Sequence, residues 1–140
     1  MNREFLYELL ETASVSGFEE EIQRKVIKYA RGFADEIYTD EIADVVSIVN
    51  PDAEIKVMLS AHMDEIGLQV IKIEQDGRIM VKSMGCSWMY TTYQSRVRFR
   101  NGTIGIVASR VRPEDLNGQF TNLYVDIGVS SKEEVLKYVD

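Results

Sequence analysis

The segment Ser60-Ala61-His62-Met63-Asp64-Glu65-Ile66-Gly67-Leu68-Gln69 decides how the rest of the chain is interpreted. It follows the apolar run Ile55-Lys56-Val57-Met58-Leu59, which predicts a fully buried strand. In an open α/β sheet, ligands bind at the carboxyl ends of such strands. His62 is the only histidine of the 140 residues, and it stands at that end with Asp64 two positions later.

Two interpretations of His62 follow from this position. In the first, the imidazole is a hydrogen-bonded residue at a strand end with no chemistry, which is the commoner role for a lone His-x-Asp pattern. In the second, His62 is a metal ligand and Asp64 orients its ring, because ligating histidines donate their other ring N–H to a carboxylate. The residues alone leave both interpretations open.

The composition is typical of a soluble globular protein, with 45% apolar and 28% charged residues. A formal charge of −7 argues against a nucleic-acid partner, because there is no excess of basic side chains to contact phosphates. The single cysteine, Cys86, excludes an internal disulfide and indicates a reducing compartment. The N-terminus lacks the apolar core of a signal peptide, and no run approaches the ~20 residues of a membrane span. We therefore expect a cytoplasmic protein without a membrane partner.

The first part of the chain, residues 1–67, begins with two predicted helices. Apolar residues recur at helical spacing over residues 3–13, and Asn2 is the expected N-cap. Ser16 and Glu19 form the pattern of a capping box, which predicts the start of a second helix.

Strands follow these helices. Short strands are predicted at residues 37–39 and 45–49, before the buried strand at 55–59. Between the first two, Ala43-Asp44 forms a turn that is less permissive of positive φ than one with glycine would be. Helices followed by strands fit half of an α/β layer rather than a finished domain.

The second part, residues 68–140, predicts a small antiparallel sheet or barrel. Asp76-Gly77 and Asn101-Gly102 are signals for tight hairpin turns between short apolar strands. Residues 130–134 form another capping box, which predicts a short helix. The aromatic loop at residues 84–93 holds the only tryptophan, and it fits an interface or a satellite core equally well.

The sequence AHMDEIG, preceded by SVSGFEEEI and followed by DIGVSSKEE, resembles the N-terminal part of the tetrahedral, or glutamyl and deblocking, aminopeptidases. These are two-metal exopeptidases that assemble into large shells. The resemblance implies that residues 1–67 open an α/β metallopeptidase catalytic domain and that residues 68–140 form a β-rich dimerisation domain. It also implies a truncated chain with both parts incomplete, because enzymes of the family are about two to three times the length of this chain.

By the same resemblance, His62 matches a metal ligand and Asp64 matches the carboxylate that orients it. The metal of a complete enzyme would be zinc or cobalt. No other position matches a ligand, and the second histidine of the family is absent from this sequence. Because catalytic zinc normally takes three protein ligands, we expect this chain alone to bind divalent metal weakly or not at all and to be inactive.

Three functions remain open from the sequence. The first is a metal-dependent aminopeptidase that acts on peptides when a second chain complements this one. The second is a stand-alone interaction module that forms a homo-oligomer through its β domain. The third is a glycan-active hydrolase with two carboxylates as acid and base, although no spacing selects such a pair. An unpaired strand at residues 55–59 would favour an oligomer, since open strand edges associate.

Overall fold

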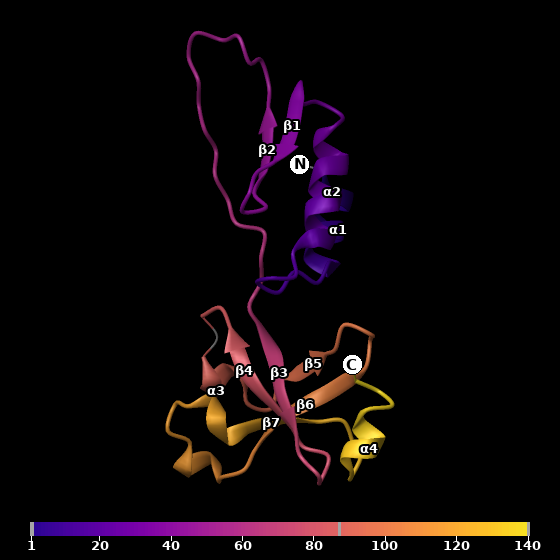
Figure 1. Ribbon diagram of the computed structural model, residues 1–140. Coiled ribbons are helices and arrows are strands. Elements are labelled where there is room, and N and C mark those ends of the chain that lie inside the picture. The colour runs from indigo at the N-terminus through magenta and orange to yellow at the C-terminus, as the bar shows by residue number, and fades with distance from the viewer. Residues whose placement is uncertain (1, 87, 140) are drawn as a thin grey trace. The chain divides into compact units, whose positions relative to one another are not determined.

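The computed structural model describes residues 2–86 and 88–139, and the chain divides into two compact units, Met1–Glu65 and Ile66–Asp140 (Figure 1). The first unit holds two helices and a two-stranded sheet, and the second holds a five-stranded sheet with short helices. Over the described residues, every helix is too short or too polar to cross a membrane.

Two helices pack together in the first unit. Helix α1 spans Arg3–Glu11, and the side chain of Asn2 accepts a 3.2 Å hydrogen bond from the Phe5 N–H, which confirms the predicted N-cap. Helix α2 spans Glu20–Ala30. The rings of Phe5 and Tyr29 stack with centroids 3.7 Å apart and planes inclined by 6°, so the apolar faces of the two helices meet.

The predicted capping box of the second helix is wrong. The N-cap of α2 is Glu19, and no side chain forms a cap hydrogen bond there. Instead, the Glu19 carboxylate accepts a 2.7 Å hydrogen bond from the Gly17 N–H, and the Ser16 hydroxyl donates to Asp64. Gly17 has φ of +90°, so the chain turns sharply between Ser16 and the helix. The turn leaves the Ser16 side chain available for a distant partner.

The predicted strands at residues 37–39 and 45–49 are confirmed. Strand β1 (Glu36–Thr39) pairs antiparallel with β2 (Val45–Ile48). The turn between them contains Ala43 at φ of +70°, a left-handed conformation that side chains with a Cβ rarely adopt.

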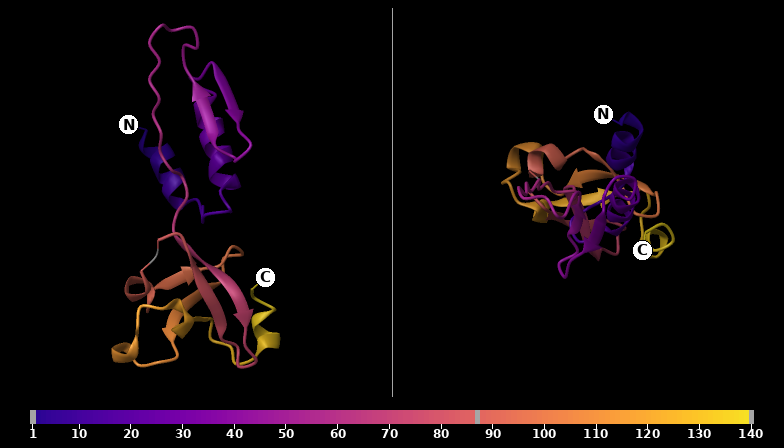
Figure 2. Two further views of the ribbon diagram at one scale, coloured as in Figure 1. Left: turned by 60° about the vertical axis from the view of Figure 1, so that its left-hand side comes forward. Right: turned by 90° about the horizontal axis from the view of Figure 1, so that it is seen from above.

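The prediction of a buried strand at residues 55–59 is wrong. The run forms no strand, and Ile55, Val57, Met58 and Leu59 are 83%, 80%, 89% and 93% exposed. Figures 1 and 2 both show a long irregular trace after β2. Because a strand needs a hydrogen-bonding neighbour, and the described part of this unit supplies none to the run, its apolar side chains stay uncovered.

The second unit is built on one antiparallel sheet, as predicted, and its strand order is β3-β4-β7-β6-β5. Its strands are β3 (Gly67–Ile73), β4 (Ile79–Met84), β5 (Arg96–Arg98), β6 (Ile104–Ser109) and β7 (Leu123–Asp126). The sheet is a half-barrel in which β3 and β5 are the outer strands.

Short helices and turns connect these strands or follow the last of them. They are α3 (Met89–Thr92), the 3₁₀ turns η1 (Pro113–Asp115) and η2 (Phe120–Asn122), and α4 (Lys132–Val135). The Ser131 side chain accepts a 3.2 Å hydrogen bond from the Glu134 N–H, which confirms the second capping box. The hairpin glycines Gly77 and Gly102 have φ of +84° and +93°, as tight turns require.

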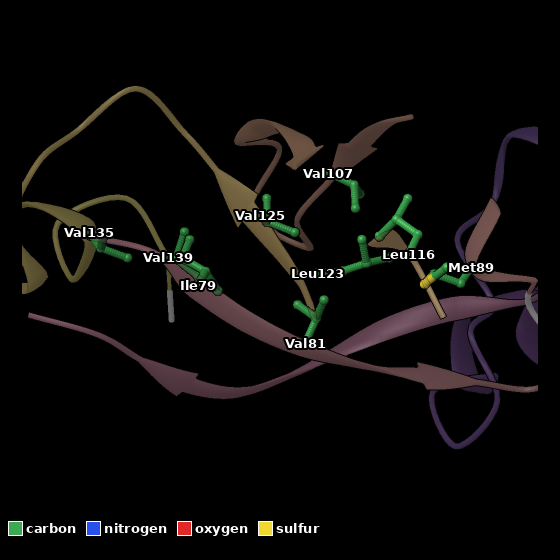
Figure 3. Close-up of a cluster of buried hydrophobic side chains, with 9 residues drawn as sticks. All are labelled: Ile79, Val81, Met89, Val107, Leu116, Leu123, Val125, Val135 and Val139. Carbon is green, nitrogen blue, oxygen red and sulfur yellow. The ribbon is translucent and has the colours of Figure 1, made fainter. Parts of the chain in front are cut away.

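The core of the second unit lies on one face of the sheet (Figure 3). Its side chains are Ile79, Val81, Met89, Val107, Leu116, Leu123, Val125, Val135 and Val139. Met89 comes from the aromatic loop and is buried, whereas Trp88 and Tyr90 of the same loop are exposed. Ser87, also in this loop, lies outside the described residues. The loop therefore adds one residue to the core and leaves two aromatic side chains on the surface.

Candidate functional site

The candidate site consists of His62 and Asp64, near the end of the first unit. Nδ1 of His62 lies 3.0 Å from Oδ1 of Asp64 and 3.0 Å from its backbone oxygen. The side chain of His62 is 86% exposed and that of Asp64 is 39% exposed. The expected buried strand does not precede the pair, so His62 follows an exposed segment of chain.

The neighbours of His62 select its tautomer. Both atoms near Nδ1, the carbonyl oxygen and the carboxylate oxygen of Asp64, can only accept hydrogen bonds. Nδ1 must therefore carry the proton in the neutral ring, which leaves Nε2 with a free lone pair. This is the tautomer in which a histidine can present Nε2 to an electrophile or a metal ion.

Ser16 joins the site from the loop between the two helices. Its hydroxyl donates a 2.6 Å hydrogen bond to Oδ2 of Asp64. This hydrogen bond, and after it the one with His62, hold the pKa of Asp64 below its ordinary value, since both favour the charged carboxylate. Sequence reasoning missed Ser16 because its spacing to Glu19 indicates a helix cap.

A second contact fastens the same two segments. The Glu65 N–H donates to the Ser14 carbonyl at 2.9 Å, and the Ser14 N–H donates to Oε1 of Glu65 at 3.1 Å. Val15 and Glu65 form an isolated parallel bridge. Residues 14–16 therefore hold residues 64–65 through backbone and side-chain hydrogen bonds.

The donor set of this chain does not by itself fit a catalytic metal ion. Among the described residues, no three His, Cys, Asp or Glu side chains lie together in a way that could hold one. His62 offers one nitrogen, and both carboxylate oxygens of Asp64 already have hydrogen-bond partners. Catalytic zinc usually takes three protein ligands, whereas this site supplies only one.

Comparison with known proteins defines the class. Residues 45–140 match the family described as M42 glutamyl aminopeptidase, so the chain belongs to this family of aminopeptidases. The family is metal-dependent. A putative aminopeptidase of Acetivibrio thermocellus is 35% identical over 145 residues, which cover all of this chain and 44% of the relative. The predicted resemblance to this family is confirmed.

Solved structures resemble the chain over nearly its whole length. The TET aminopeptidase of a marine sediment Thaumarchaeota archaeon gives a TM-score of 0.86 at 26% identity and covers 99% of this chain. The Pyrococcus horikoshii TET1 peptidase is described as assembling into a tetrahedron or a large octahedral shell. It gives a TM-score of 0.78 at 27% identity and covers 98% of this chain. A Thermotoga maritima protein described as an endoglucanase gives a TM-score of 0.78 at 32% identity and covers 95% of this chain.

The chain spans less than half the length of these proteins. It covers 42% of the archaeal aminopeptidase, 43% of the TET1 peptidase and 41% of the Thermotoga protein. It matches their N-terminal part. More than half of each relative therefore has no counterpart in these 140 residues.

Proposed function

We propose that the chain contributes one metal ligand to a metal-dependent aminopeptidase. His62 supplies the ligand through Nε2, and Asp64 holds the ring through Nδ1. The supporting observation is the 3.0 Å contact between His62 and Asp64, found in a member of an aminopeptidase family. In a complete enzyme of this kind, bound metal ions would supply activation of water and polarisation of the scissile carbonyl.

In this role, the 140-residue polypeptide alone is inactive. One imidazole cannot hold two metal ions, so the other ligands and the general base come from outside these 140 residues. They would lie in the part of the relatives that this chain does not cover. The exposed apolar run at residues 55–59 supports this proposal, because large uncovered apolar patches mark surfaces that bind another protein.

A complementation assay tests the function. The chain is mixed with the uncovered part of the Acetivibrio thermocellus relative, and aminoacyl-nitroanilide hydrolysis is measured with zinc or cobalt. We expect turnover only in the mixture, and we expect the His62→Ala variant to abolish it. Turnover by the pure 140-residue chain, or its absence from a mixture that forms a stable complex, would contradict the proposal. Calorimetric titration of the chain alone should show weak or no metal binding.

A stand-alone interaction module is the second candidate. It is favoured by the second unit, whose core side chains Ile79, Val107, Leu123, Val125 and Val135 are below 2% exposed without any partner. A homo-oligomer would follow from this role, and light scattering measures it. A stable dimer that does not bind the complementing polypeptide would favour the interaction module over the aminopeptidase.

A glycan-active hydrolase is the third candidate, and only the description of the Thermotoga protein favours it. Neither the sequence nor the contacts of the described residues select a pair of carboxylates as acid and base. Release of reducing ends from cello-oligosaccharides by the complemented mixture would support this candidate.

A further inference from the structure

We propose that Ser16 is a positioning residue: its hydroxyl holds the Asp64 carboxylate in the orientation that fixes the imidazole of His62. Its value to a peptidase rests on the proposed function above. The contacts that carry it involve only residues of this chain.

The Asp64 carboxylate is anchored at both oxygens. Oδ2 accepts from Ser16 at 2.6 Å, and Oδ1 lies 3.0 Å from Nδ1 of His62. A 2.6 Å O–H···O distance is at the short end of the usual range, as expected for a charged acceptor. Two anchors on opposite oxygens fix both the rotamer and the plane of the carboxylate, so Oδ1 stays directed at the imidazole.

The His62–Asp64 contact needs this support because it is exposed. With side chains 86% and 39% exposed, the two residues compete with water for every hydrogen bond. Exposed contacts between polar side chains contribute little, since ordering two side chains offsets most of the attraction. Without Ser16, the carboxylate would sample its other staggered rotamers, and the ring would turn with it.

The loop that carries Ser16 is itself fixed on both sides. Ser14 exchanges hydrogen bonds with Glu65 in both directions, and the Gly17 N–H donates to the Glu19 carboxylate. Ser16 is held between these contacts. A serine that capped α2 would stabilise that helix, yet the Ser16 hydroxyl donates to Asp64 instead.

The tautomer of His62 is the direct readout. Because His62 is the only histidine, its ring nitrogens give one set of signals in a ¹⁵N spectrum. At alkaline pH, where imidazole is neutral, we expect an excess of the Nδ1–H form, whereas a free histidine side chain prefers Nε2–H. Ser16→Ala should reduce this excess, because only the backbone oxygen of Asp64 remains as a fixed acceptor, and should average the χ1 rotamers of Asp64. Ser16→Thr should retain both the excess and the rotamer. Ser47→Ala, at an exposed serine of β2, is the control and should change neither.

A double variant with Asp64 shows whether Ser16 acts on the His62 tautomer through the Asp64 carboxylate or through a general structural effect. In an Asp64→Ala background, adding Ser16→Ala should leave the tautomer ratio unchanged, because Ser16 acts only through that carboxylate. A wild-type tautomer ratio in Ser16→Ala would overturn the proposal, as would a further change in the double variant. If Ser16→Ala fails to fold, Ser16→Thr decides the question, and loss of the Nδ1–H excess in that variant would also overturn it.

The spectroscopic result and the proposed function can fail separately. The tautomer measurement uses the 140-residue chain without metal or substrate. If the complemented mixture has no peptidase activity but Ser16→Ala shifts the tautomer, the function fails and the positioning role stands. If the mixture is active and Ser16→Ala leaves the tautomer unchanged, the positioning role fails and the function stands.

Discussion

Ser14 and Glu65, which are 51 positions apart in the sequence, exchange hydrogen bonds in both directions. The Glu65 N–H donates to the Ser14 carbonyl, and the Glu65 carboxylate accepts from the Ser14 N–H. Ser14 is only 3% exposed, so water cannot easily replace these partners. The contact ties the loop after α1 to the segment that carries the candidate site.

The Glu65 side chain should therefore stabilise the first unit. Glu65→Ala leaves the buried Ser14 N–H without its acceptor, and an unsatisfied buried donor costs about 1–3 kcal/mol. Glu65→Gln keeps an acceptor oxygen at the same place and should cost less. Urea unfolding followed in the first unit measures both variants, and amide exchange at Ser14 should accelerate only in Glu65→Ala. Equal losses of unfolding free energy in the two variants would contradict the role of the Glu65 side-chain oxygen as acceptor.

Replacing Ala43 should stabilise the first unit. Its φ of +70° costs an alanine about 1–2 kcal/mol, whereas glycine adopts this conformation freely. Glycine also loses more entropy on folding, so we expect a net gain of about 0.5–1 kcal/mol from Ala43→Gly. Ala53→Gly, at a position without positive φ, is the matched control and should lower stability. A loss of stability in Ala43→Gly would show that the turn carries no strain.

Gly105 of β6 should tolerate no side chain. A Cβ there would collide with the side chain of Val125 and approach Asp126 O and Ile127 Cγ2 at 3.1 Å. Overpacking of this kind costs about 1–3 kcal/mol, so Gly105→Ala should lower the urea midpoint of the second unit. Ile106→Val, at an exposed position of the same strand, should change stability by less than ~0.5 kcal/mol. A midpoint for Gly105→Ala equal to the wild type would refute the close approach.

The second unit should lose stability in acid through Glu74. Its carboxylate lies 3.1 Å from Lys72 Nζ and 3.1 Å from Arg110 Nη2, and these contacts lower its pKa from the ordinary 4.5. A lowered folded pKa means that the stabilisation is complete above the unfolded pKa and disappears as pH falls through the folded value. Urea midpoints measured from pH 6 downwards should therefore fall more steeply in the wild type than in Glu74→Gln. Parallel curves would exclude Glu74 as a source of acid sensitivity.

Much of the fold could be predicted because its signals are local. The cap at Asn2, the cap at Ser131 and the glycine turns each depend on residues within a few positions of one another. The run at residues 55–59 could not be predicted in the same way. Its apolar character indicates what it would do beside another strand, but burial requires that strand to be present.

The candidate site was predictable only in part. The spacing of His62 and Asp64 allowed a hydrogen bond between them, and the structure has it at 3.0 Å. Ser16 could not be found, because its partner is 48 positions away and its nearer neighbour Glu19 completes a plausible helix cap. The Ser16 hydroxyl group donates to the distant Asp64 carboxylate and does not cap the nearby helix α2. The turn at Gly17, with its positive φ, separates Ser16 from the start of that helix.

The exposed apolar run at residues 55–59 should govern association. Val57→Lys with Leu59→Lys adds charge to two side chains that are 80% and 93% exposed, so unfolding free energy should change by less than ~0.5 kcal/mol per site. The same variant should weaken self-association or binding of the complementing polypeptide, because a charged edge resists strand pairing. Light scattering and a pull-down measure these effects. Thr39→Lys with Ser47→Lys adds equal charge at exposed polar positions and should leave association intact. If the first double variant instead unfolds the first unit, the run is already buried in solution, and the complementation surface proposed here does not exist.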